Sequence, residues 1–328
     1  MIIRSLRLAR RPNGLPRDDD FELVEEDSPR LARGEVLVEN RYFSVDPYHR
    51  EEMEEGHWAL HGPMEGRTVG VVIESADPGL PLGTMVAHRR AYATHAVVGD
   101  ARPLPQPLPV ALSAYLGILG GTGLTAYVGL VPVGGLREGE TVLITSAGGA
   151  VGTAAAHIAR RLGAGRIIGV TGSDEKAQRL RDGPCDVVYN YRTQPVAELL
   201  AHEQVDLALE GVGGESLEAT IGAMRDRGRI AWVGAISQYL HPDQPPAAPR
   251  NLYDIVGKEL RVEGYLVRNY LHHRDAYEGF MTPLVAAGRV PLDETVAEGL
   301  ESAIGALRSV LEGGNYGKQL VRLAPAPN

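Results

Sequence analysis

The sequence contains one cysteine, Cys185, among its 328 residues. A disulfide within the chain needs two cysteines and a four-cysteine zinc lobe needs four, so both are excluded. This cysteine usage fits a reducing, cytoplasmic setting. Lysine is also scarce, since it occurs only at positions 176, 258 and 318, and arginine supplies the other basic residues. That bias suggests a GC-rich bacterial genome.

The sequence also lacks a surplus of basic residues, and its formal net charge is −9. Nucleic-acid phosphates bind a basic protein face, so we expect no nucleic-acid partner. The N-terminal residues Met1 to Leu8 are interrupted by two arginines, which argues against a signal peptide.

The stretch between Arg102 and Arg137 contains no charged residue. Its apolar part, residues 110–133, is long enough to cross a bilayer. It includes Gly117-x-x-x-Gly121, a spacing typical of paired membrane helices. Paired glycines and Pro132 interrupt it, however, and these residues break long helices. We therefore predict a buried pair of short helices and no membrane partner.

The first 110 residues or so predict many short strands. Apolar and polar residues alternate in segments such as 2–8 and 35–42, with glycine and proline between the segments, which favours a partly open barrel. A proline-rich connector at 101–109 indicates a domain boundary. The tail from about residue 287 returns to this pattern. We predict one domain of residues 1–112 with 287–328, and a second of residues 113–286.

The second domain is organised around residues 141–152, Thr-Val-Leu-Ile-Thr-Ser-Ala-Gly-Gly-Ala-Val-Gly. A short apolar strand is followed by a turn of small residues and then by a predicted helix, an order typical of a dinucleotide-binding motif. Gly149 would let the backbone approach a pyrophosphate, and Gly152 would let the helix pack closely on the strand. Ala147 stands where the common pattern has its first glycine.

Strands and helices alternate after this motif. The predicted strands are 142–144, 166–170, 187–189, 207–209 and 229–233, and the predicted helices are 151–162, 174–181, 196–203 and 216–224. This order predicts an α/β fold with a doubly wound parallel sheet, which binds its ligand at the carboxyl ends of the strands.

The segment after the second of these strands, Thr171-Gly-Ser-Asp-Glu-Lys176, selects the cofactor. An NAD site usually has an acidic residue here that holds the ribose hydroxyls. The hydroxyl of Ser173 and the ammonium of Lys176 suit a 2′-phosphate instead, which favours NADPH. Two alternatives stay open. Ser173 could simply cap a helix on which Lys176 is solvated, and Asp174 could be the acidic residue of an NAD site.

Seven short motifs lie in register along nearly the whole chain. They are SVDPYHR (44–50), GLTAYVGL (123–130), AGGAVG (147–152), GSDEK (172–176), NY (190–191), GAISQY (234–239) and GNYGK (314–318). Together they resemble the zinc-independent medium-chain dehydrogenases/reductases, in the branch of leukotriene B4 12-hydroxydehydrogenase/prostaglandin reductases and plant double-bond reductases. The resemblance implies a Rossmann sheet with a GroES-like β-barrel domain, NADPH as the cofactor, a homodimer, and reduction of an activated carbon–carbon double bond.

The resemblance also implies two groups of site residues. The cofactor-binding group comprises Gly149, Ala150 and Val151 at the pyrophosphate, Gly172, Ser173, Lys176 and Tyr191 at the 2′-phosphate, Ser237, Leu266 and Val267 at the nicotinamide end, and Asn315, which the C-terminal tail returns to the cofactor. The catalytic group comprises Tyr48, which would face the substrate, and Tyr239, near the nicotinamide ribose.

No metal site is predicted. A catalytic zinc needs three protein ligands, the barrel domain has no cysteine, and its histidines show no tight ligand spacing with an acidic partner. Charge that develops on a substrate oxygen would then need hydrogen-bond donors such as Tyr48 or Tyr239. His49 departs from the methionine that the family usually has after that tyrosine, so it could alter the pocket or supply a second proton donor.

The resulting hypothesis is an oxidoreductase that transfers a hydride from NADPH to small α,β-unsaturated carbonyl compounds and reduces their carbon–carbon double bond. A role in bacterial secondary metabolism is compatible with it, and there the enolate could instead close a ring. Two alternatives stay open: a quinone or carbonyl reductase on the same scaffold, and a non-catalytic NADPH-binding sensor.

Overall fold

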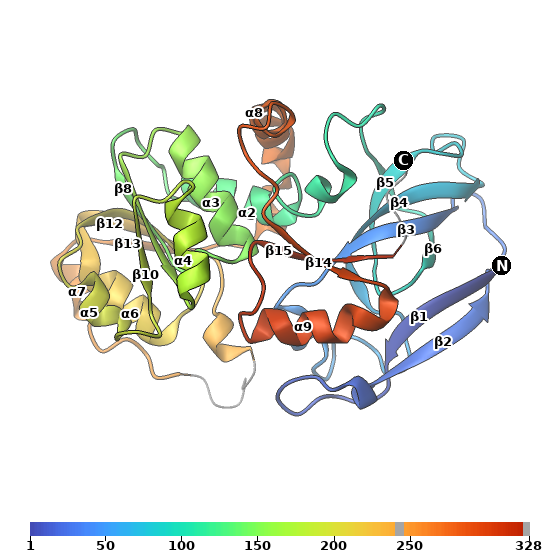
Figure 1. The fold of residues 1–328 in the computed structure, drawn as a ribbon, viewed down its shortest axis with the longest axis horizontal. Coiled ribbons are helices and arrows are strands. Elements are labelled where there is room, and N and C mark those ends of the chain that lie inside the picture. The colour runs from blue at the N-terminus through green and yellow to red at the C-terminus, as the bar shows by residue number, and fades with distance from the viewer. Residues whose placement is uncertain (240–245, 324–328) are drawn as a thin grey trace. The chain divides into compact units, whose positions relative to one another are not determined.

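The computed structural model describes residues 1–239 and 246–323, which form two compact units (Figure 1). Unit 1 consists of Met1–Leu116, Glu294–Gly314 and residues 318–323 of the described tail. Unit 2 consists of Gly117–Asp293 and the short tail segment Asn315–Gly317. The boundaries expected from the sequence, after residues 112 and 286, fall slightly earlier than those of the structure, which lie after residues 116 and 293. The sequence-based division also kept the whole tail in the first domain, whereas three tail residues pack with unit 2.

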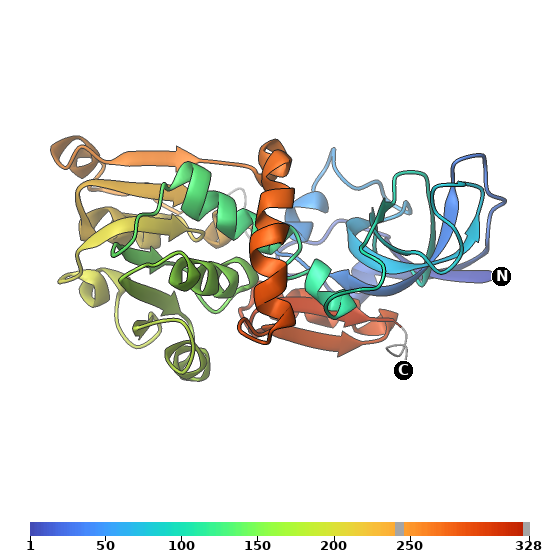
Figure 2. The same ribbon diagram turned by 90° about the horizontal axis from the view of Figure 1, so that it is seen from above.

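Unit 2 contains a six-stranded sheet in the order β10-β9-β8-β11-β12-β13, and every neighbouring pair is parallel. This is the Rossmann order, in which the chain reverses direction across the sheet next to its first strand. The strand β13 lies at one edge of the sheet (Figure 2). The strands are β8 (Thr141–Ile144), β9 (Arg166–Thr171), β10 (Val187–Asn190), β11 (Val205–Glu210), β12 (Met224–Trp232) and β13 (Arg261–Gly264).

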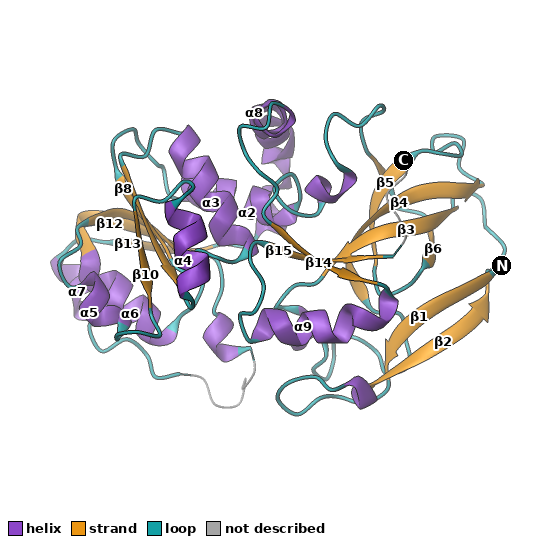
Figure 3. Ribbon diagram, viewed as in Figure 1, coloured by secondary structure: helices purple, strands orange, loops and turns teal. Residues whose placement is uncertain are grey.

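Helices cover both faces of this sheet (Figure 3). Such a sheet is buried on both sides, which explains why β8 is a continuous apolar run with no exposed side chain. The helices of unit 2 are α2 (Gly121–Val128), α3 (Ala150–Arg161), α4 (Asp174–Arg181), α5 (Val196–Leu200), α6 (Gly214–Ala223), α7 (Tyr253–Gly257) and α8 (Arg274–Ala286). The predicted doubly wound α/β fold is confirmed.

Most predicted elements of unit 2 differ from the structure by one or two residues at an end, and two of them differ by three residues or more. The helix expected to reach residue 203 ends at Leu200, where a turn leads into β11. The strand expected to start at residue 229 starts at Met224, because Met224 already pairs with Val205 before the register between β11 and β12 shifts.

The uncharged stretch forms short buried helices, as predicted. A 3₁₀ turn at Leu112–Tyr115 precedes α2, and a π-helical turn at Gly129–Val133 follows it. Within residues 1–239 and 246–323, no helix is long and apolar enough to cross a membrane. Gly123 is required within α2, because a side chain there would place a carbon 1.8 Å from the carbonyl oxygen of Ile118.

Unit 1 contains a seven-stranded sheet and a separate two-stranded sheet. The larger sheet has the order β14-β15-β3-β4-β5-β7, and β6 pairs with β3. Its strands are β3 (Val36–Ser44), β4 (Glu65–Ser75), β5 (Met85–Arg90), β6 (His95–Val98), β7 (Arg102–Pro103), β14 (Glu294–Glu298) and β15 (Lys318–Arg322); the smaller sheet pairs β1 (Ile2–Leu8) with β2 (Phe21–Asp27).

The C-terminal tail completes unit 1. The helix α9 (Ala303–Leu311) buries Ile304 and Leu307 in the same core as Phe43 and Trp58. The strand β15 then runs antiparallel to β3, with Leu320 opposite Ser44. That register brings Lys318, at the start of β15, to Asp46, which follows the end of β3 and precedes the short helix α1 (His49–Glu52).

Candidate functional site

The predicted cofactor-binding residues of unit 2 follow the carboxyl ends of five different strands. Across the sheet from β10 to β13, these ends are followed by Tyr191, by Gly172 to Lys176, by Gly149 to Val151, by Ser237, and by Leu266 with Val267. Carboxyl ends of parallel strands meet at one edge of a sheet, where Rossmann folds bind dinucleotides. The order is also the order expected of one extended ligand, from a 2′-phosphate to a nicotinamide.

The glycine turn lies between β8 and α3. Gly149 is the N-terminal capping residue of α3, and Ala150 and Val151 are its first residues. A side chain at position 152 would place a carbon 2.4 Å from the carbonyl oxygen of Ser146, so the helix can approach the turn only with glycine there. A side-chain carbon at position 149 would lie 3.3 Å from its nearest neighbours, which are oxygen atoms of Ser146. The turn therefore leaves backbone open beside the positive end of a helix, which suits a pyrophosphate.

Groups suited to a 2′-phosphate gather beyond β9 and β10. The hydroxyl of Tyr191 lies so close to Gly172 that a side-chain carbon there would be only 2.8 Å from it. Lys176 is half-buried, and burial followed by the nearby Arg192 lowers the pKa of its ammonium. Two cations close enough to influence each other in this way favour the binding of an anion near both.

The alternatives left open for this segment have mixed outcomes. Ser173 does cap α4, since its hydroxyl oxygen accepts from the backbone N–H of Lys176 at 3.3 Å. Lys176 is not fully solvated, however. The Asp174 carboxylate accepts a hydrogen bond at 2.8 Å from the side-chain amide of Asn190, which is the last residue of the strand β10.

The nicotinamide end of the edge is organised by a buried carboxylate that the sequence analysis missed. Glu210, the last residue of β11, accepts from the backbone N–H groups of Val212 and Gly213 at 2.7 and 2.8 Å. The carbonyl of Val212 in turn accepts from the hydroxyl of Ser237 at 2.6 Å. Glu210 therefore holds the loop against which Ser237 is placed.

Leu266 and Tyr239 differ in their exposure and in their contacts. Leu266 follows β13 and is 53% exposed, and Val267 beside it is half-buried. The hydroxyl oxygen of Tyr239 accepts from the backbone N–H of Ala235 at 3.5 Å. Tyr239 is thus turned back on its own loop.

The tail segment Asn315–Gly317 is docked on the glycine turn of unit 2. The N–H of Gly317 donates to the carbonyl of Gly148 at 2.9 Å, and the side-chain amide of Asn315 donates to the carbonyl of Gly317 at 2.7 Å. The guanidinium carbon of Arg179, on α4, lies 3.7 Å from the centre of the Tyr316 ring. These contacts bring Asn315 to the glycine turn and explain why these three residues pack with unit 2.

In unit 1, the surroundings of Tyr48 are built on a buried ion pair. Asp46 forms an ion pair with the ammonium of Lys318, and both side chains are almost fully buried. The carboxylate also accepts from the hydroxyl of Ser44 at 2.6 Å and lies 3.6 Å from the guanidinium of Arg67. Burial alone would raise the pKa of Asp46, but Lys318 and Arg67 outweigh it and hold that pKa below its ordinary value.

The Tyr48 hydroxyl is buried and has no hydrogen-bond partner among the described residues. Burial, and then the charge of Asp46, raises the pKa of this phenol, so it stays protonated at neutral pH. Such a hydroxyl is a hydrogen-bond donor without an acceptor in the described protein. Tyr48 lies in unit 1 and Tyr239 in unit 2.

Known proteins resemble this chain over nearly its whole length. Residues 4–105 match the family described as the N-terminal domain of oxidoreductase, and residues 150–287 match the one described as zinc-binding dehydrogenase. Prostaglandin reductase 1 of Mus musculus is 35% identical, over 97% of this chain and 98% of its own. The NADP(+)-dependent 2-alkenal reductase of Nicotiana tabacum is 35% identical, over 95% and 94%. The chain belongs to the medium-chain dehydrogenase/reductase family.

Its branch of this family is that of the prostaglandin and double-bond reductases. The crystal structure of CurA from Vibrio vulnificus in complex with NADPH has a TM-score of 0.91 to this chain at 30% identity, and the match covers 98% of this chain and 100% of that one. The family and the fold class predicted from the sequence are confirmed.

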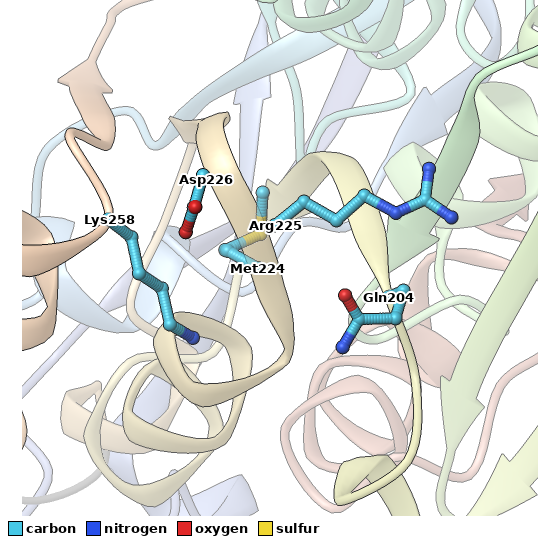
Figure 4. Close-up of a pocket in the computed structure, with 5 residues that line it drawn as sticks. All are labelled: Gln204, Met224, Arg225, Asp226 and Lys258. Carbon is cyan, nitrogen blue, oxygen red and sulfur yellow. The ribbon is translucent and has the colours of Figure 1, made fainter.

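Two further features of this medium-chain dehydrogenase/reductase lie outside the site. Among the residues that the structure describes, no three His, Cys, Asp or Glu side chains form a group that could hold a metal ion. A hollow of about 540 Å³ lies near the amino ends of β11 and β12, where Gln204, Met224 and Lys258 line it (Figure 4). The ammonium of Lys258 donates there to the carbonyl of Gly222 at 2.7 Å, so this lysine caps α6.

Buried histidines of unit 1 should make the protein sensitive to acid. Burial lowers the pKa of His88 to about 3, well below that of an unfolded histidine. Between pH 6.5 and about 3 the unfolded chain therefore binds more protons than the folded one, and the free energy of unfolding falls as the pH falls. We expect His88→Gln to reduce this slope by up to roughly 1.4 kcal/mol per pH unit, measured by chemical denaturation from pH 7 to pH 4.5.

The exposed His57 supplies the control. His57→Gln should keep the slope of the natural protein, because that side chain is 52% exposed. An unchanged slope in His88→Gln would contradict the assignment of a neutral, buried histidine at position 88.

Proposed function

We propose that this protein uses NADPH to reduce the carbon–carbon double bond of small α,β-unsaturated carbonyl compounds, without a metal. The observation that carries the proposal is the row of residues along the carboxyl edge of the Rossmann sheet, which begins at the paired cations Lys176 and Arg192. The names of the relatives, prostaglandin reductase and 2-alkenal reductase, support the same chemistry.

The residues present suit NADPH at each part of the molecule. Lys176, Arg192 and Tyr191 would hold the 2′-phosphate, since charge-assisted hydrogen bonds are strong and suit phosphate oxygens. The open backbone at Gly149 and the start of α3 would hold the pyrophosphate. Asn315, which the tail brings to the glycine turn, would contact the cofactor there. Ser237 would hold the nicotinamide end, and Leu266 with Val267 would offer that end an apolar surface.

When bound, NADPH supplies the hydride that adds to the β-carbon of the substrate. The electron pair of the double bond then moves toward the carbonyl, and negative charge develops on the carbonyl oxygen. Tyr48 would donate a hydrogen bond to that oxygen, because its protonated hydroxyl lacks an acceptor in the described protein. Protonation of the α-carbon completes the reduction. Tyr239 is the second candidate donor, since its loop follows β12 at the same edge of the sheet.

The finer parts of the proposal concern the substrate and the assembly. A substrate with a second electrophile would let the enolate form a carbon–carbon bond instead of accepting a proton, which gives a reductive ring closure suited to bacterial secondary metabolism. We also propose a homodimer, which follows from the resemblance and is tested by the mass in solution.

The catalytic role of Tyr48 predicts a large loss of rate in Tyr48→Phe. The loss of one hydrogen-bond donor to a developing oxyanion should lower kcat about 100-fold to 1,000-fold with an enone substrate, as NADPH consumption measures. The matched control is Tyr253→Phe, because Tyr253 is 79% exposed and its hydroxyl should not matter. A kcat in Tyr48→Phe equal to that of the natural protein would remove Tyr48 from the mechanism.

A panel of acceptors tests the reaction itself. Enones and alkenals should speed NADPH consumption, whereas quinones and saturated aldehydes should not. Turnover of quinones alone would establish the quinone reductase alternative. Tight NADPH binding without turnover of any acceptor would establish the sensor alternative.

The 2′-phosphate site predicts how cofactor choice depends on Lys176. Lys176→Ala should weaken NADPH binding about 10-fold to 100-fold, the value of a hydrogen bond to a charged group, and should change NADH binding less than about twofold. Titration of protein fluorescence with each cofactor measures both constants. Lys258→Ala is the matched control, because Lys258 caps α6 near the amino ends of the strands. Equal weakening of both cofactors by Lys176→Ala would refute the phosphate role.

A further inference from the structure

His49 is a completely buried imidazole directly after Tyr48 in the chain. Its ring lies among aromatic side chains, with centroid distances of 4.6 Å to Tyr48, 5.4 Å to Trp58 and 5.7 Å to Tyr92. A polar ring in such surroundings is costly unless its hydrogen bonds are satisfied.

The hydrogen bonds of His49 define which nitrogen carries the proton. Nδ1 lies 2.8 Å from the hydroxyl oxygen of Tyr92. Nε2 has no hydrogen-bond partner among the described residues, and it faces the Asp46 carboxylate at 4.0 Å. With Tyr92 as donor to Nδ1, an N–H at Nε2 points toward the negative charge. The other tautomer would turn a lone pair toward that charge, so the tautomer protonated at Nε2 is favoured.

This environment excludes His49 as an acid or as a substrate ligand. Burial lowers its pKa to about 3, so the ring is neutral at working pH. The side chain has no exposed surface, so no substrate reaches it. His49 is therefore not the second proton donor that was considered from the sequence.

Two polar side chains beside the Tyr48 ring, those of His49 and Arg67, also lie near Asp46. The His49 ring meets the Tyr48 ring edge-on, at an interplanar angle of 81°. The Arg67 guanidinium carbon lies 5.9 Å from the centre of the Tyr48 ring, and the same guanidinium lies 3.6 Å from Asp46. Because the Tyr48 hydroxyl has no hydrogen-bond partner in the described protein, its direction depends on how the ring is packed, and these two groups take part in that packing.

Tyr92 is held in an unusual conformation at the far end of this chain of contacts. Its φ angle is 54°, a left-handed backbone conformation that bulky residues rarely adopt. Its carbonyl accepts from the N–H of Leu6 at 2.8 Å, and its side chain is fully buried. The hydroxyl of Tyr92 is therefore presented to His49 by a fixed backbone.

We propose that His49 is a positioning residue, which the hydrogen bond from Tyr92 and the charge of Asp46 hold in one orientation so that the Tyr48 hydroxyl points at the substrate. The inference rests on the proposed function, in which Tyr48 donates to the substrate oxygen. It gives His49 a role that an apolar side chain of similar size, such as methionine, could not fill in the same way, since a thioether accepts only weakly and offers no N–H.

The test compares two substitutions at position 49. One should be the more stable variant but the less active, and the other should be the less stable but the more active. In His49→Asn, the amide oxygen can replace Nδ1 and accept from Tyr92, but the smaller side chain leaves a cavity. In His49→Met, the apolar side chain fills the space and removes the unsatisfied Nε2. We expect His49→Met to be at least as stable as the natural protein and His49→Asn to be less stable, as chemical denaturation measures. We expect kcat with an enone to fall about tenfold or more in His49→Met. In His49→Asn it should fall by a smaller factor, about threefold, because this variant keeps the hydrogen bond to Tyr92 but loses the ring that meets Tyr48.

Tyr92→Phe gives an independent arm. It should lower kcat about as much as His49→Met, and the double variant should lower it no further, because both remove the same hydrogen bond. The KM for NADPH should stay unchanged throughout. His57→Met, at an exposed histidine, should change neither activity nor stability.

Two results would overturn the inference: full kcat in His49→Met, or activity that follows stability across the variants, as a merely structural role requires. Failure of the proposed function looks different. In that case the natural protein reduces no enone, or Tyr48→Phe keeps full activity before any His49 variant is made.

Discussion

The cofactor-binding unit depends on the close approach of α3 to the turn after β8. Only glycine at position 152 permits this approach, because any side chain would meet the carbonyl of Ser146 at 2.4 Å. The approach fixes where the helix begins, and the parallel sheet then brings the other strand ends to the same edge. Residues as far apart in sequence as Tyr191 and Leu266 thus border one ligand-binding edge. The backbone bond between Gly317 and Gly148 adds the tail to it.

In unit 1 the corresponding constraint is the ion pair between Asp46 and Lys318. A buried charge without its partner costs several kcal/mol, so neither residue is tolerated alone at this depth. The pairing of β15 with β3 supplies the partner from the end of the chain. The carboxylate then stays ionised near Arg67 and His49, which both lie beside the Tyr48 ring. A structural pair and the proposed hydrogen-bond donor are therefore parts of one arrangement.

Much of unit 2 could be predicted from the sequence because its signals are local. The apolar strand, the small-residue turn and the Ser173 cap lie within a few residues of one another, and α4 has the predicted bounds. The residues that were missed depend on distant pairings. Arg192 looks like an ordinary surface residue until β9 and β10 lie side by side, and Lys318 meets Asp46 only through the register of β15. The strand β13 was missed because Arg-Val-Glu-Gly has no alternation long enough to predict a strand. Whether Tyr48 acts as a donor depends on a chemical step that no pattern encodes.

The most direct test of the central claim follows the hydride. The natural protein is incubated with an enone and NADPH that carries deuterium at the transferable position of the nicotinamide, and the product is examined by NMR. The account predicts a saturated ketone with deuterium on the former β-carbon and a solvent-derived proton on the α-carbon. Deuterium on the carbonyl carbon of an unsaturated alcohol would contradict conjugate reduction and would make the protein a carbonyl reductase.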